Sequence, residues 1–100
     1  MSITNEMRLE FDSIAENEGF ARVAVGAFFS QLNPTLEEIC DVKTAVSEAV
    51  TNSIIHGYQE ECKKIEIRCC IHKCEKILEV EIEDKGCGIA DIKKAMEPLF

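Results

Sequence analysis

The chain has 100 residues, of which 46% are hydrophobic, and it carries a formal net charge of −8. This length accommodates one domain or part of one, with a single modest core. No apolar run reaches the ~20 residues of a membrane span, and the polar start does not resemble a signal peptide, so we expect a soluble, cytoplasmic protein with no membrane partner. The acidic charge argues against direct nucleic-acid binding, which usually requires a basic surface.

The six cysteines are expected to be reduced and to act as small hydrophobic residues. Their even number suggests disulfides, but without a secretion signal that interpretation is weak. Cys69, Cys70, His72 and Cys74 are close in sequence, yet no CxxC pair is present, and adjacent strand residues point to opposite faces. Because zinc sites usually have spaced ligand pairs, structural zinc is the less favoured interpretation.

The first half of the chain predicts one strand and two helices. Alternating apolar residues predict a strand from Met7 to Phe11. Apolar residues at helical spacing predict a helix from Asn17 to Leu32, which ends at Asn33-Pro34. Phe20 and Phe28 on this helix are interpreted as core residues rather than as an aromatic ligand cage.

A second helix is predicted to begin at Thr35, because Glu38 three residues later completes a capping box. Gly57 is expected to end it, since glycine tolerates a left-handed conformation. Its apolar side is made of Ile39, Val42, Val46, Ala49, Val50 and Ile54.

The second half predicts a hairpin and a short helix. Strands are expected from Lys64 to His72 and from Lys76 to Asp84, joined by a tight turn at Lys73 to Glu75. A short helix is expected from Ile89 to Met96, before Pro98. The chain then stops on an apolar pair, which we interpret as an interruption.

Glu48 and Asn52 on the second helix are candidate site residues. Positions four apart in a helix differ by about 40° around the axis and roughly 6 Å along it, so the two side chains project from nearly one line. Asn52 offers an amide oxygen suited to Mg²⁺, and Glu48 is placed to orient or deprotonate a hydroxyl or water. The alternative is that both are ordinary polar residues on a solvated face. The weak helix formers Thr51, Asn52 and Ser53 together in mid-helix favour a functional site.

His56 and Asp84 extend this candidate site. His56 lies near the predicted end of the helix, where a histidine can interact with the helix dipole or hydrogen-bond the last carbonyls. This structural role is favoured over a catalytic one. Asp84 has the parity of the apolar residues in its strand, so its carboxylate is predicted to face the core and to need a donor, such as the amino group of adenine. Gly86 and Gly88 leave room for a purine. The alternative is an ordinary D-x-G turn.

These residues carry a resemblance to a known superfamily. Glu48-x-x-x-Asn52 with His56-Gly57 resembles the N box of the gyrase, heat-shock chaperone and histidine-kinase ATPases, and the segment from Asp84 to Ile89 resembles their first glycine box. More narrowly, three segments resemble the anti-sigma F factors of endospore-forming bacteria: Asn17 to Val23, Val46 to Asn52 and Glu97 to Phe100.

The resemblance implies an α+β fold, the two-layer α/β sandwich of Bergerat-type ATPases. It also implies a protein-serine kinase that holds a sporulation sigma factor inactive and uses ATP to phosphorylate an anti-anti-sigma partner. In that family's pattern Glu48 is the catalytic base, Asn52 the Mg²⁺ ligand, Asp84 the adenine reader and Arg22 part of the partner-binding surface. The family is dimeric, so a homodimer is expected.

The chain departs from the family's pattern at its C-terminal end. The family continues past Pro98-Leu99-Phe100 into a lid, a second glycine box and a closing strand, so we expect residues 1–100 to be the N-terminal, C-terminally truncated part of one kinase domain. Two alternatives remain. One is a sigma-sequestering interaction module without catalysis, and the other is the ATP-binding domain of a sensor histidine kinase.

Overall fold

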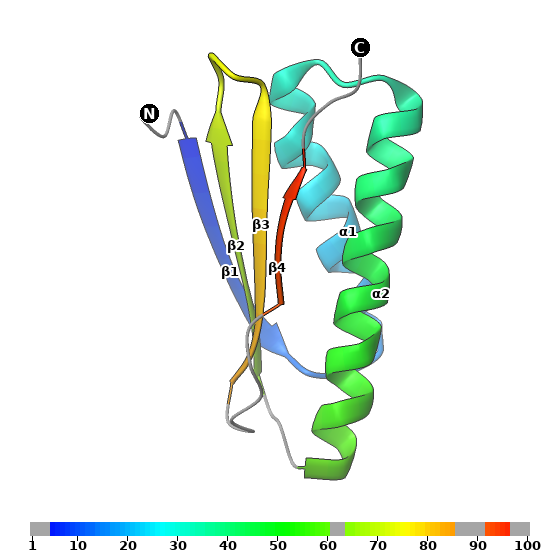
Figure 1. The fold of residues 1–100 in the computed structure, drawn as a ribbon. Helices are drawn as coiled ribbons and strands as arrows, with labels where there is room; N and C mark the ends of the chain where they lie inside the picture. The colour runs from blue at the N-terminus through cyan, green and yellow to red at the C-terminus, as the bar shows by residue number, and fades with distance from the viewer. Residues whose placement is uncertain (1–4, 61–63, 86–91, 97–100) are drawn as a thin grey trace.

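Two helices cover one face of an antiparallel sheet whose four described strands follow the order β1-β2-β3-β4 (Figure 1). The computed structural model describes the backbone of residues 5–60, 64–85 and 92–96, and the side chains of 5–55 and 64–84. The expected α+β, two-layer architecture is confirmed. The elements are β1 (Asn5–Asp12), α1 (Glu16–Phe29), the 3-10 turn η1 (Ser30–Leu32), α2 (Leu36–Glu60), β2 (Lys64–His72), β3 (Ile77–Lys85) and β4 (Ile92–Met96).

Strand register gives the sheet one apolar and one charged face. Leu9 of β1 is opposite Ile67 of β2, and Ile67 is also opposite Ile82 of β3. Because side chains alternate along a strand, this pairing aligns the apolar residues of all three strands on the face that the helices cover. The predicted hairpin is confirmed, and in its turn Lys76 adopts a positive φ of 58°.

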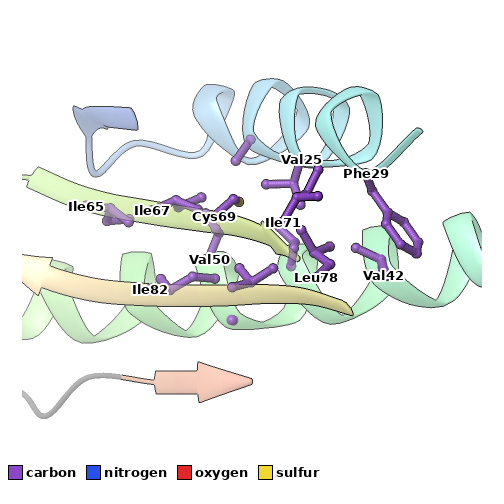
Figure 2. Packing of buried hydrophobic residues seen from close by; sticks show 14 of the residues in the cluster. Val25, Phe29, Val42, Val50, Ile65, Ile67, Cys69, Ile71, Leu78 and Ile82 are labelled. Atoms are coloured by element: carbon purple, nitrogen blue, oxygen red, sulfur yellow. The ribbon is translucent and has the colours of Figure 1, made fainter. Parts of the chain in front are cut away.

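The core lies between the helices and this apolar face, and Figure 2 shows its packing. Val25 and Phe29 of α1 and Val42 and Val50 of α2 are at most 3% exposed. Burying side chains of this size stabilises a fold by about 1.5–3 kcal/mol each. The sheet contributes Ile65, Ile67, Cys69, Ile71, Leu78, Val80 and Ile82.

The start of α2 is held by the predicted capping box. The backbone N–H of Glu38 donates to Oγ1 of Thr35 over 3.1 Å, and the N–H of Thr35 donates to Oε1 of Glu38 over 2.7 Å. These two bonds satisfy donors that a helix N-terminus otherwise leaves without partners. Asn33, with a φ of 53°, ends the preceding turn in the left-handed conformation.

Three expectations from the sequence were wrong. Gly57 does not end α2, which continues to Glu60, because one glycine costs a helix only about 1 kcal/mol. Residues 92–96 form strand β4 rather than a helix, because Ile92 pairs with Ile82 along the open edge of β3. Phe20 is 51% exposed and meets Phe11 edge-on at 6.2 Å rather than entering the core.

Within the described part of the chain, no helix is long and apolar enough to cross a membrane.

Candidate functional site

Glu48 and Asn52 lie on an exposed stripe of α2, one turn apart, as the spacing predicted. The opposite side of the same helix is buried by Val46, Ala49 and Val50, so packing fixes which way the stripe faces. No hydrogen bond or ion pair joins either polar side chain to another residue of 5–55 or 64–84. Both side chains are exposed.

Asp84 is buried at the end of β3, with only 7% of its surface exposed. It lies opposite Ile65 in the register, on the apolar face that the helices cover, so the parity prediction is confirmed. Its Oδ1 atom has no hydrogen-bond partner among the described residues. A buried carboxylate without a donor costs free energy, which a ligand with an amino group would recover.

The exposed stripe of α2 that carries Glu48 and Asn52 lies toward the same end of the molecule as Asp84. Figure 1 shows that α2 and β3 run in the same direction, from the hairpin end of the sheet toward the end where both finish. Asn52 belongs to the last third of α2, and Asp84 is the next-to-last residue of β3. The fold thus places the amide of Asn52, the carboxylate of Glu48 and the buried carboxylate of Asp84 toward one end of the molecule.

Arg22 lies on α1, where its side chain is 46% exposed, and it pairs with Glu18 at 3.5 Å. The same Glu18 carboxylate accepts a hydrogen bond from the hydroxyl of Ser47 on α2, directly before Glu48. Sequence reasoning missed this link, because it depends on how the two helices pack. The side chain of His56 and the whole of Gly86 and Gly88 lie outside the described residues.

The opposite face of the sheet is charged and contains a groove of about 590 Å³. Arg8 and Arg68 approach the buried carboxylate of Glu66 at 3.5 and 3.8 Å, and Arg68 also pairs with Glu81. Neither Glu48, Asn52 nor Asp84 lines this groove, so it is separate from the candidate site. Other glutamates on this face are Glu6, Glu10, Glu79 and Glu83.

The described cysteines are free thiols. Cys40 and Cys74 are exposed, and Cys69 is buried under the helices. Burial, and then the neighbouring Cys70, raises the pKa of Cys69 to about 12. Among the described residues no group of three or more His, Cys, Asp or Glu side chains is arranged to hold a metal ion. Cys62 and Cys87 lie outside the described residues.

The side-chain oxygens of Asn52 on α2 and Asp84 on β3 are of the kinds that a magnesium nucleotide needs. Asn52 offers an oxygen of the type that Mg²⁺ prefers, and the carbonyl of an amide adds no charge. Asp84 offers an acceptor without a partner to a base amino group. Because the protein carries a net charge of −8, the phosphates of a nucleotide need a cation beside them.

The family model "Histidine kinase-like ATPase domain" matches residues 4–99. Curated relatives named anti-sigma F factor are similar over nearly the whole chain. The chain is 56% identical over 97 residues to the protein of Clostridium perfringens (strain 13 / Type A), which covers 96% of this chain and 68% of the relative. It is 60% identical over 97 residues to that of Clostridium novyi (strain NT), covering 96% and 66%.

A third relative, from Thermoanaerobacter sp. (strain X514), is 54% identical over 100 residues, covering 100% of this chain and 68% of the relative. The chain therefore spans about two thirds of the length of these relatives.

Proposed function

The chain belongs to the anti-sigma F factor family and to the histidine kinase-like ATPase domains, and on this basis we propose that the protein holds a sporulation sigma factor inactive and uses Mg–ATP to phosphorylate a serine of an anti-anti-sigma partner. The observation that carries the nucleotide part of this proposal is Asp84, a buried carboxylate with an Oδ1 atom that has no partner among the described residues. It lies at the end of the molecule where α2 presents Glu48 and Asn52.

Glu48 is the proposed general base. Its carboxylate takes the proton of the partner's serine hydroxyl as that oxygen forms a bond to the γ-phosphorus of ATP. The bond from the γ-phosphorus to the bridging oxygen breaks, and ADP leaves with that electron pair. The exposed position of Glu48 supports this role, because the hydroxyl belongs to a second protein and must reach the base from solvent.

Asn52 is the proposed ligand of Mg²⁺, which supplies positive charge to the triphosphate when bound. Asp84 binds the adenine amino group, and Gly86, Gly88 and His56 are proposed to complete the nucleotide site from outside the described side chains. The roles of these residues rest on their match to the family's two motifs.

Arg22 is proposed to belong to the partner-binding surface. Val23, the next residue on α1, is 59% exposed, and Phe20, about one turn before Val23, is 51% exposed. An arginine beside apolar side chains is a common composition for the centre of a protein interface. We further propose that the protein acts as a homodimer in the cytoplasm, where a sigma factor works.

The same α1 surface favours a second candidate function, that of a sigma-sequestering module that binds its partner without catalysis. Phe20, Arg22 and Val23 are exposed independently of any nucleotide. Phosphate transfer by the full-length protein distinguishes the two functions.

The proposal is tested with the full-length protein, radiolabelled ATP, Mg²⁺ and the anti-anti-sigma partner. We expect Asp84→Asn to weaken ATP binding by at least tenfold in calorimetry, because a neutral amide oxygen replaces a charged carboxylate as the acceptor and the amide adds a donor that adenine's amino group cannot accept. We expect Asn52→Ala to abolish phosphate transfer to the partner. Wild-type protein that binds the sigma factor but transfers no phosphate would support the sequestering module instead. Asn52→Ala activity within twofold of wild type would remove Asn52 from the metal site.

A further inference from the structure

One oxygen atom of Glu18 on α1 is shared between Arg22 and the helix that carries the proposed base. The Oε2 atom of Glu18 accepts a hydrogen bond from the hydroxyl of Ser47 on α2, and Nη1 of Arg22 lies 3.5 Å from the same atom. Two donors at one acceptor atom draw on the same electron density, so a change at one donor alters the bond to the other. Arg22 and Ser47 are therefore linked through a single atom.

The side of α2 that carries Ser47 faces α1. Lys43 precedes Ser47 by four residues, so the two lie on one side of the helix. A Cβ atom added to Gly26 of α1 would lie only 2.7 Å from Cε of Lys43. The two helices thus approach each other closely at Lys43, and one turn later the hydrogen bond from Ser47 to Glu18 joins them again.

This hydrogen bond is directional, whereas the apolar contacts around it are not. Val46 of α2 and Val25 of α1 are buried in the core, and apolar packing depends little on orientation. A serine hydroxyl has one O–H group, which inside a helix often donates to the carbonyl four residues earlier. Ser47 donates to α1 instead. The bond therefore determines how this turn of α2 is oriented against α1.

Glu48 is the next residue after Ser47 and lies about 100° further around the helix, where it is exposed. A general base must lie within hydrogen-bond reach of the hydroxyl that it deprotonates, and a misplacement of about 1 Å can lower a rate by about 10²-fold. The backbone that carries Glu48 is held from one side by the bond of Ser47. Its orientation therefore bears on the rate of phosphate transfer.

We propose that Ser47 is a positioning residue for Glu48, and that Glu18 makes this positioning depend on the partner. When an oxygen of the partner binds the guanidinium of Arg22, Oε2 of Glu18 loses one of its two donors, and its hydrogen bond with Ser47 becomes stronger. The base is then held most firmly while the serine substrate is docked. This inference rests on the proposed phosphate transfer and adds to it a link between docking on α1 and the base on α2.

The first test is single-turnover phosphorylation of the anti-anti-sigma partner by the full-length protein. Ser47→Ala removes the hydroxyl, Ser47→Thr keeps one, and Thr44→Ala changes an exposed residue of the same helix as a control. At saturating ATP and partner, we expect Ser47→Ala to lower the maximal rate about three- to tenfold, the range of one hydrogen bond. Ser47→Thr should restore most of this rate, and Thr44→Ala should match wild type.

The affinity for ATP and the partner concentration that gives half the maximal rate should stay within about twofold in Ser47→Ala, because neither substrate touches Ser47. In a Glu18→Ala background, Ser47→Ala should lower the maximal rate by less than about twofold further, since its acceptor is already gone. Full additivity of the two losses would show that Ser47 does not act through Glu18.

The second test is backbone hydrogen exchange of the ADP-bound protein, with and without a partner whose acceptor serine is replaced by alanine. We expect the partner to slow exchange in the peptide that contains Glu48, and to slow it much less in Ser47→Ala. Equal slowing in both proteins would overturn the link to docking.

An unchanged maximal rate in Ser47→Ala would overturn the positioning role and leave phosphate transfer standing. So would a loss that Ser47→Thr does not restore and that comes with a lower urea midpoint, because that result indicates packing alone. Wild-type protein that transfers no phosphate would overturn the proposed function and this inference together.

Discussion

The hydroxyl of Ser47 on α2 donates to the carboxylate of Glu18 on α1, and the same carboxylate pairs with Arg22 at 3.5 Å. Glu18 therefore contacts both Arg22, the proposed partner-binding residue, and α2, the helix that carries the proposed base Glu48. Ser47 directly precedes Glu48, so the position of α1 is linked to that of the exposed stripe of α2.

Glu18→Gln should release Arg22 and weaken sigma-factor binding. The neutral amide loses the ion pair, so the guanidinium samples more orientations before it binds. We expect a severalfold lower affinity for the sigma factor by surface plasmon resonance, with ATP affinity unchanged. Glu16→Gln, which removes a carboxylate from the same turn of α1, is the matched control. An equal effect of both substitutions would indicate a change in net charge rather than a loss of positioning.

Glu48→Gln should separate nucleotide binding from phosphate transfer. A general base acts on the serine hydroxyl rather than on ATP, so its loss leaves the affinity for ATP within about twofold and lowers single-turnover phosphorylation by about 10²–10⁴-fold. Calorimetry and rapid-quench kinetics on the same preparation measure both quantities. If ATP binding and phosphorylation fall together while the fold stays intact, Glu48 is a binding residue.

Phe29→Ala should test the packing of α1 on the core. Phe29 is 1% exposed, and truncating a buried phenylalanine usually costs about 3–5 kcal/mol in the free energy of unfolding. Urea titration should show a lower midpoint with an unchanged slope. Val23→Ala, at a residue that is 59% exposed on the same helix, should stay within about 0.5 kcal/mol of wild type. Similar losses for both variants would contradict the assignment of the buried face.

Thiol alkylation should follow burial. Since the pKa of Cys69 is raised to about 12, its thiol stays protonated at pH 8, where the thiolate is about one part in ten thousand. Burial first, and the carboxylate of Glu6 second, also raise the pKa of Cys70. Peptide mapping after brief iodoacetamide treatment should find Cys40 and Cys74 labelled first and Cys69 labelled only after unfolding. Native Cys69 reacting as fast as Cys40 would contradict the buried sheet face.

Elements with local signals could be predicted from the sequence. In β1, β2 and β3 apolar and polar residues alternate, and this alternation predicts which face of the sheet each side chain occupies. The prediction that Asp84 faces the core is confirmed for this reason. The capping box at Thr35 and Glu38 likewise involves neighbours on one helix turn. By contrast, β4 forms because β3 offers it an edge, and that pairing joins residues whose own sequence favours a helix.

In the candidate site, too, the features that depend on one element could be predicted, and those that depend on packing between elements could not. Glu48 and Asn52 could be found from their spacing on one helix, whereas the contact of Ser47 with Glu18 depends on how α1 packs against α2.

The charged face of the sheet has a consequence for assembly. Across β1, β2 and β3 it carries the acidic residues Glu6, Glu10, Asp12, Glu66, Glu79, Glu81 and Glu83 and the basic residues Arg8, Lys64 and Arg68. Two copies that approach through this face meet as like charges, at a distance where repulsion is weakly screened by physiological salt. We therefore expect any self-association to use the helices or the strand edges rather than this face of the sheet.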